Sequence, residues 1–150
     1  MTRYLVDTNV LSELVGVTPD AAVTRFFARL PSSDLAGSAI SRFEIERGLA
    51  LMPSGRRRKL YADRYAVLLA GLGAGILPFD ERAASVAAHI VAAARTGGRS
   101  LDDHLFDVLI AATASVHGLV VLTRNERPFH ATGVPFENPW TGTRDVSSGK

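Results

Sequence analysis

The chain has 150 residues, 47% of them hydrophobic, and a formal net charge of +2. This size and composition favour one ordered globular domain over a disordered chain. Because the chain has no cysteine, a disulfide scaffold and a thiolate metal site are excluded. No apolar run approaches the roughly 20 residues that span a bilayer, and the first residues lack the pattern of a signal peptide. We therefore expect a soluble, cytoplasmic protein without a membrane segment.

The first half of the chain is predicted to alternate strands with helices. Thr18 and Pro19 fit the cap and the first position of a helix that runs to Leu30. The turn sequence MPSG separates two later helices. In chain order, the expected elements are a strand at Arg3–Val6, the helix after Thr18, a strand at Leu35–Ser41, a helix at Phe43–Leu51 and a basic amphipathic helix at Arg56–Leu72.

The second half continues the same alternation. Asp80 is expected to cap a long helix, and a nearly apolar helix ends at Gly118. The expected strands are Gly75–Phe79, Leu119–Thr123 and Val134–Phe136, and the segment from Thr141 on is polar. Strands that alternate with helices predict an α/β fold with a mostly parallel sheet covered on both faces. In such sheets, ligands bind beyond the carboxyl ends of the strands.

Acidic residues follow the first two predicted strands. Asp7 comes directly after the first strand, where it could cap the next helix or belong to a site. Glu44 lies just after the second strand, and Ser41-x-x-Glu44 also matches a capping box. Taken alone, each residue therefore has a structural explanation.

Asp107 is harder to explain by helix structure alone. It lies within an otherwise nearly apolar helical segment, which predicts burial. An isolated buried carboxylate is costly, so Asp107 should be paired or bound to a cation. Asp102 and Asp103, one turn earlier, are expected to cap the helix start, and Asp103 is a further candidate for the same site.

Polar residues also follow the strand at Leu119–Thr123. Among them, Glu126 could equally be an acid of a helix start or a member of the site. If Asp7, Glu44 and Asp107 converge, their repulsion would raise a pKa or require a cation. A hard divalent ion with oxygen ligands suits these acids. The four histidines are scattered without zinc spacing and are assigned no role.

The motifs YLVDTNVLSEL, SAISRFEIERGL, FDVLIAATASVHGLVVLTRNERPF and VPFENPW occur in this order. Together they resemble PIN-domain ribonucleases, and more narrowly VapC-type toxins of type II toxin–antitoxin modules, including the FitB-like branch. The resemblance runs from about Tyr4 to Trp140. It implies a Rossmann-like, three-layer α/β/α fold with four to five strands over residues 1–140. The polar segment at 141–150 is expected to be a flexible tail.

The resemblance also implies an acidic site that binds Mg²⁺ or Mn²⁺. The three acids that match the family motifs, and would act as metal ligands and catalytic residues, are Asp7, Glu44 and Asp107. Asn9 and Thr123 match residues that organise the site.

One position departs from the family pattern. Many members have an acid where this chain has Pro128, and in the FitB-like pattern an acid can occupy the place of Asn125. Asn125 remains a catalytic candidate through its amide, but it cannot act as a base. Glu126 could replace the missing acid. The number of metal ions that the site would hold stays open.

The implied function is that of a Mg²⁺-dependent endoribonuclease, the toxin of a toxin–antitoxin pair, which is inhibited by a VapB-like antitoxin and forms a homodimer. Structured RNA such as tRNA or rRNA is the expected substrate. Two alternatives remain open: a catalytically silent PIN-like module that binds RNA or a partner, and a metal-dependent DNA nuclease. Basic residues predicted to contact RNA are Arg42, Arg56, Arg57, Arg58, Lys59 and Arg124.

Overall fold

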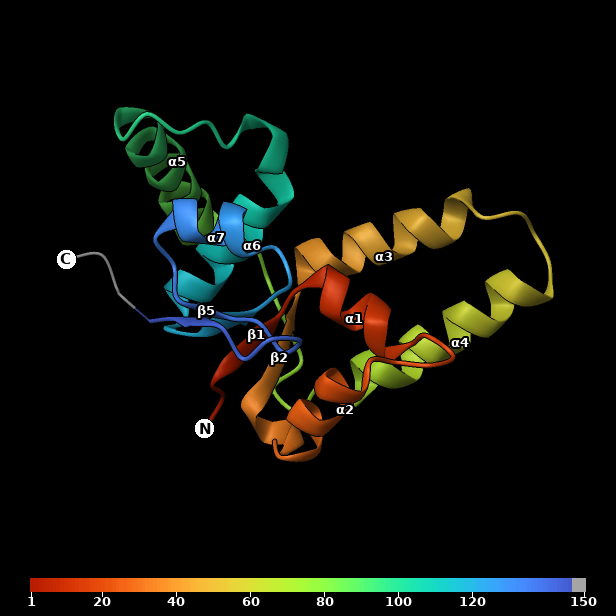
Figure 1. The fold of residues 1–150 in the computed structure, drawn as a ribbon. Coiled ribbons are helices and arrows are strands. Elements are labelled where there is room, and N and C mark those ends of the chain that lie inside the picture. The colour runs from red at the N-terminus through yellow and green to blue at the C-terminus, as the bar shows by residue number, and fades with distance from the viewer. Residues whose placement is uncertain (147–150) are drawn as a thin grey trace.

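The computed structural model describes residues 1–146 and shows a six-stranded sheet at the centre of the molecule (Figure 1). The strand order is β3-β2-β1-β4-β5-β6, and all neighbours are parallel except β5 and β6. The strands are β1 (Tyr4–Val6), β2 (Leu35–Ser38), β3 (Ile76–Leu77), β4 (Val120–Leu122), β5 (Phe136–Glu137) and β6 (Arg144–Asp145). The predicted mostly parallel α/β sheet is confirmed, with six strands rather than four to five.

The sixth strand comes from the segment that was predicted to be a flexible tail. Arg144 and Asp145 pair antiparallel with β5. A backbone hydrogen bond closes the turn between β5 and β6: the Asn138 N–H donates to the Thr143 carbonyl at 2.8 Å. The last part of the predicted tail, 147–150, lies outside the described residues.

Helices cover both faces of the sheet. They are α1 (Thr8–Leu14), α2 (Ala21–Ala28), α3 (Ala39–Leu51), α4 (Arg56–Ala70), α5 (Glu81–Thr96), α6 (Leu105–Val116) and α7 (Glu126–Thr132), with short 3₁₀ helices η1 (Ser32–Asp34) and η2 (Asp102–His104). In Figure 1, α5, α6 and α7 lie together on one side, whereas α1 to α4 occupy the other.

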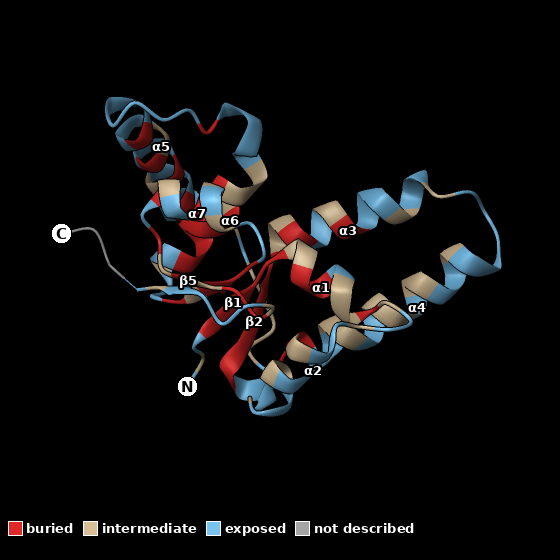
Figure 2. Cartoon of the chain, in the orientation of Figure 1, coloured by how far each residue is buried: buried red, intermediate tan, exposed pale blue. Residues whose placement is uncertain are grey.

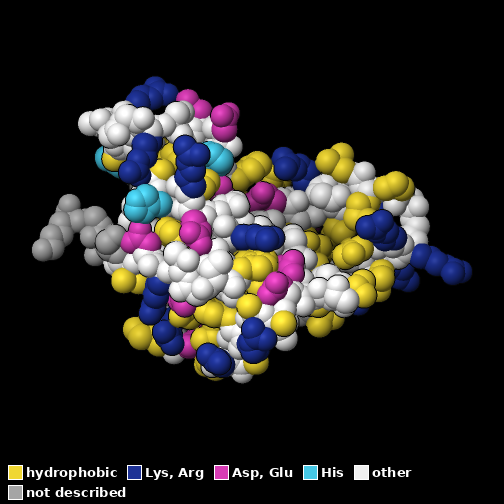
Figure 3. Space-filling model, viewed as in Figure 1, with side chains coloured by type: hydrophobic (Ala, Val, Ile, Leu, Met, Phe, Trp, Pro, Cys, Tyr) yellow, Lys and Arg dark blue, Asp and Glu magenta, His cyan; other side chains and the backbone are white. Residues whose placement is uncertain are grey.

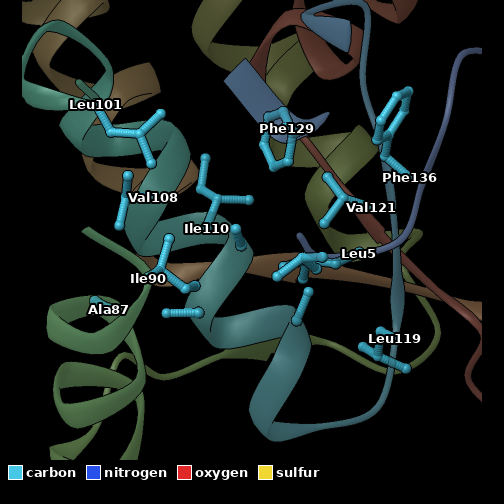
Figure 4. Close-up of a cluster of buried hydrophobic side chains, with 14 of the residues drawn as sticks. Leu5, Ala87, Ile90, Leu101, Val108, Ile110, Leu119, Val121, Phe129 and Phe136 are labelled. Atoms are coloured by element: carbon cyan, nitrogen blue, oxygen red, sulfur yellow. The ribbon is translucent and has the colours of Figure 1, made fainter. Parts of the chain in front are cut away.

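Alternate side chains of strand β1 pack into two different hydrophobic clusters, one on each face of the sheet. Leu5 packs into the cluster formed with α5, α6 and α7, which Figure 4 shows together with Val121 and Phe129. Tyr4 and Val6 point to the opposite face and pack in a second cluster with residues of α1 and α3. Successive side chains of a strand point to opposite faces, so this one strand contributes to both cores. The predicted three-layer α/β/α arrangement is thereby confirmed.

Helix α2 starts later than predicted. Its cap is Asp20, whose Oδ1 accepts a hydrogen bond from the Ala22 N–H at 2.8 Å, so the prediction of Thr18 as cap was wrong. Asp80 does cap α5, as predicted, through the Ala83 N–H. Both caps satisfy amide groups that the first helical turn leaves without a partner.

The strand β2 ends at Ser38, three residues earlier than predicted. Ser38 therefore becomes the cap of α3, and its Oγ accepts a hydrogen bond from the Ser41 N–H at 2.9 Å. The predicted Ser41–Glu44 capping box was wrong, because Ser41 already lies inside the helix. Glu44 is consequently not needed at the helix start.

Helices α3 and α4 form an arm that extends away from the sheet (Figure 1). No residue of α4 is fully buried, and Figure 2 shows the outer parts of both helices exposed or only half-buried. Among the described residues, no helix is long and apolar enough to cross a membrane.

Candidate functional site

Asp7 lies at the carboxyl end of β1 and is buried, with 2% of its surface exposed. One oxygen, Oδ1, accepts a hydrogen bond from the Thr8 N–H at 2.7 Å, which makes Asp7 the cap of α1. The other, Oδ2, accepts a hydrogen bond from Thr123 Oγ1 at 2.7 Å. Asp7 therefore caps α1, one of the two explanations left open by the sequence, and its second oxygen is enclosed beside Thr123, while its membership of a functional site stays a prediction.

The surroundings of Asp7 disfavour its charged form. Burial, together with the charges of Asp107 and Glu44, raises the pKa of the Asp7 carboxyl group to about 7, although the hydrogen bonds from Thr123 and Thr8 oppose the shift. An acid that keeps its proton close to neutral pH responds strongly to any nearby cation.

A chain of hydroxyl groups positions Glu44. Thr8 Oγ1 lies 2.8 Å from Glu44 Oε1 and 2.9 Å from Ser41 Oγ, which in turn lies 3.2 Å from Ser38 Oγ. Each hydroxyl has one proton to donate. The consistent pattern therefore runs from Ser38 through Ser41 and Thr8 to the Glu44 carboxylate. Sequence reasoning missed Thr8 and Ser41 as site residues, although Thr8 stands within the D-T-N opening.

Asp107 lies in the first turn of α6 with 15% of its side chain exposed. Burial and the charge of Glu44 raise the pKa of its carboxyl group, whereas His104 and a hydrogen bond with Asn125 lower it. His104 Nδ1 is 3.6 Å from Asp107 Oδ2. The structure thus gives the half-buried Asp107 polar partners, and one of them, His104, had been assigned no role.

The electrostatic coupling among Asp7, Glu44 and Asp107 places the three acids in one neighbourhood. Within residues 1–146, however, no three acidic or histidine side chains are arranged as a finished ligand set for a metal ion. Their donor chemistry nevertheless suits a hard divalent cation, because all are carboxylate oxygens and their mutual repulsion would be relieved by positive charge.

The two predicted organising residues connect the ends of β1 and β4. Thr123 donates to Asp7 and also accepts a hydrogen bond from the Asn125 N–H at 3.0 Å. Asn9 Oδ1 accepts from the Arg124 N–H at 3.3 Å. These contacts join two neighbouring strand ends around the buried carboxylate.

The auxiliary acids lie apart from this network. Glu126 Oε1 accepts a hydrogen bond from Asn138 Nδ2 at 2.7 Å, which ties α7 to the segment after β5. Asp103 is exposed on η2. Asp102 pairs with Arg95 at 3.2 Å, and no side chain caps α6, so the prediction that Asp102 and Asp103 cap this helix was wrong.

The predicted RNA-binding residues lie in different surroundings. Arg42 pairs with Glu46, and the Arg124 guanidinium stacks over the Trp140 ring at 4.9 Å. The basic run of residues 56–59 begins α4, at the outer part of the arm in Figure 1. Arg56 and Arg57 line one side of a groove of about 750 Å³ that also reaches Thr8 and Glu44.

The fold and this site define a class: an α/β/α protein with one buried and two half-buried acids at the carboxyl edge of a parallel sheet. The PIN-domain model matches residues 4–134. A VapC ribonuclease of Sinorhizobium fredii is 40% identical over 91% of this chain and 96% of its own length. The toxin FitB of Neisseria gonorrhoeae is 38% identical over 91% of this chain and 97% of its own length. The solved structure of FitAB bound to an IR36 DNA fragment has a TM-score of 0.84 and 36% identity, over 91% of this chain and 95% of that one. The chain therefore belongs to the PIN-domain family. The predicted likeness to its VapC and FitB members is confirmed.

Proposed function

We propose that the protein is a Mg²⁺- or Mn²⁺-dependent endoribonuclease and the toxin of a toxin–antitoxin pair. The observation that supports this proposal best is the buried Asp7, whose pKa is raised to about 7 beside Asp107 and Glu44. A relative named as a VapC ribonuclease, 40% identical to this chain, supports the choice of RNA as substrate.

In this proposal, Asp7, Asp107 and Glu44 hold the cation. When bound, a divalent ion supplies charge neutralisation at the scissile phosphate and activates the attacking water. Thr123 holds the Asp7 carboxylate in its orientation, Thr8 holds Glu44, and Asn125 holds Asp107. Attack in line with the leaving 3′-oxygen leaves a 5′-phosphate and a 3′-hydroxyl.

The same proposal includes a cognate VapB-like antitoxin. Its binding surface is the groove between α1, α3 and α4, which is lined by apolar side chains such as Ile45, Leu49 and Tyr65. An amphipathic partner segment can bury its apolar face in such a groove. Because the groove reaches Thr8 and Glu44, the antitoxin would also cover part of the acidic site. The solved FitAB complex, which is similar to this chain, supports the existence of a cognate antitoxin, and its position in the groove is our proposal. We further propose a cytoplasmic homodimer, the commonest symmetric assembly.

The test uses protein purified free of any antitoxin. Wild type, Asp7→Asn and Asp107→Asn are incubated with Mg²⁺ and either structured RNA or DNA of matched sequence. The proposal predicts cleavage of RNA by wild type, with 5′-phosphate products, and losses on the order of a hundredfold or more in both variants. Equal cleavage by all three proteins would refute the site. Cleavage of DNA alone would support a DNA nuclease, and binding of RNA without cleavage a silent module.

A further inference from the structure

A second pocket lies between the connection from α5 to α6 and the start of α7. Its volume is about 700 Å³, and its walls include Arg99, His104, Arg127, Pro128 and His130. Arg and His side chains lie side by side over this part of the surface in Figure 3. Neither arginine was among the residues that the sequence predicted to bind RNA.

Among the described residues, the two arginines of this pocket have no acidic partner. Within residues 1–146, Arg99 and Arg127 form no ion pair, and both are exposed. Two acids of the surrounding segments have other partners: Asp102 pairs with Arg95 at 3.2 Å, and Asp145 Oδ2 lies 2.7 Å from His130 Nδ1. The pocket therefore presents two uncompensated guanidinium groups, which can bind phosphate oxygens through a planar pair of donors.

The pocket adjoins the candidate active site. His104 lines it, and His104 Nδ1 is 3.6 Å from Asp107 Oδ2. Arg127 follows two residues after Asn125, which bonds to Asp107. Pro128 forms part of the wall and carries no charge.

We propose that this pocket binds a phosphate of the RNA strand next to the scissile one, with Arg99 and Arg127 as its ligands. This inference rests on the proposed function, because it assumes that the scissile phosphate lies at Asp7 and Asp107. RNA has one phosphate for every nucleotide, so a strand held at those acids presents further phosphates to the neighbouring surface. Arg56 and Arg57, at the start of α4, line the other groove, which reaches Thr8 and Glu44, and neither lines the pocket beside His104.

The direct test measures RNA binding without catalysis. Fluorescence anisotropy with a labelled single-stranded RNA in EDTA gives Kd for wild type, Arg99→Gln, Arg127→Gln and the double variant. Each single change should raise Kd by about fivefold, uniformly across RNA sequences, as expected for a lost phosphate contact. The slope of log K against log salt should decrease by about 0.7 for each lost contact with a single strand.

The matched control is Arg25→Gln, which removes the same charge from an exposed position on α2, away from the pocket. It should retain the Kd and the salt slope of the wild type to within about twofold, because a distant exposed charge is screened. Under cleavage conditions with Mg²⁺, the losses in the pocket variants should appear as a higher KM rather than a lower kcat, which a general loss of folded protein would not produce.

The outcomes separate this inference from the proposed function. A double variant with the Kd and salt slope of the wild type would overturn the inference even if the wild type cleaves RNA. If the wild type binds RNA without cleaving it, the proposed function fails and the anisotropy comparison still decides the pocket. Anisotropy with labelled polyglutamate tests the other acidic ligand. If the double variant binds RNA as the wild type does but binds polyglutamate more weakly, the inference is overturned and the pocket binds an acidic protein segment. Failure of the wild type to bind RNA would overturn both.

Discussion

Replacing Asp7 by Asn should stabilise the metal-free protein near neutral and alkaline pH, although it removes a residue of the proposed active site. The Asp7 carboxyl group is almost fully buried, and its pKa is raised from 3.8 to about 7. A difference of about three pH units corresponds to about 4 kcal/mol of destabilisation by the ionised form, at about 1.4 kcal/mol for each unit.

The sign follows from proton binding. Between pH 4 and pH 7 the folded state keeps the Asp7 proton that the unfolded state has released, so the free energy of unfolding falls as the pH rises through this window. Asn stays neutral at every pH and avoids this loss. It cannot accept both hydrogen bonds from Thr8 and Thr123, which costs about 1 kcal/mol. The net gain at pH 8 should therefore be about 3 kcal/mol.

Urea unfolding in EDTA, from pH 5 to pH 8, measures this effect. The wild type should lose stability across the range relative to Asp7→Asn, and Asp63→Asn, which alters an exposed acid of α4, should follow the wild type. Added Mg²⁺ should stabilise the wild type more than Asp7→Asn, because a ligand stabilises the state that binds it. Parallel pH profiles for wild type and Asp7→Asn would show that the Asp7 carboxyl group is not held at a raised pKa.

Three further changes test individual contacts. Thr8→Val removes the hydroxyl that donates to Glu44. The kcat for RNA cleavage should fall about tenfold, as for other lost contacts that orient a metal ligand. An unchanged kcat would show that Thr8 does not position Glu44. Gly73→Ala brings a Cβ within 2.7 Å of the Ser32 backbone and should lower the free energy of unfolding in urea by about 1–3 kcal/mol. Gly48→Ala, in open space within α3, should raise it by about 1 kcal/mol. Equal effects of the two changes would contradict the close approach at Gly73. Glu126→Ala should lower the melting temperature but retain RNA cleavage, because the Glu126 carboxylate accepts hydrogen bonds from Asn138 and Thr141. Lost cleavage at an unchanged melting temperature would instead place Glu126 in the active site.

Much of the fold could be predicted because hydrophobic runs and their turns alternate clearly along the chain. The strand β1 and the cap Asp80 are set by local sequence, and both were predicted. The strand β6 was not, since Arg144 and Asp145 are polar and form a strand only because β5 offers an edge for pairing. Pairing of this kind cannot be predicted from the local composition of the segment.

The candidate site shows the same division. Acids that follow strands are visible in the sequence, because parallel strands end at one edge of a sheet. The choice between Ser38 and Ser41 as cap of α3 was not visible, as either serine can accept the hydrogen bond, and the answer depends on where β2 ends. The contact between Thr8 and Glu44 joins residues 36 positions apart, so only the folded chain reveals it.

The most direct test of the proposed metal-dependent site is the rate of RNA cleavage as a function of Mg²⁺ concentration. Wild-type protein should be inactive in EDTA and should regain cleavage along a saturating curve, because the cation completes the charge balance of the acids. Asp107→Asn should remain inactive or require far more Mg²⁺. Cleavage that persists in EDTA, or a curve for Asp107→Asn that coincides with the wild type, would contradict a metal site formed by Asp7, Glu44 and Asp107.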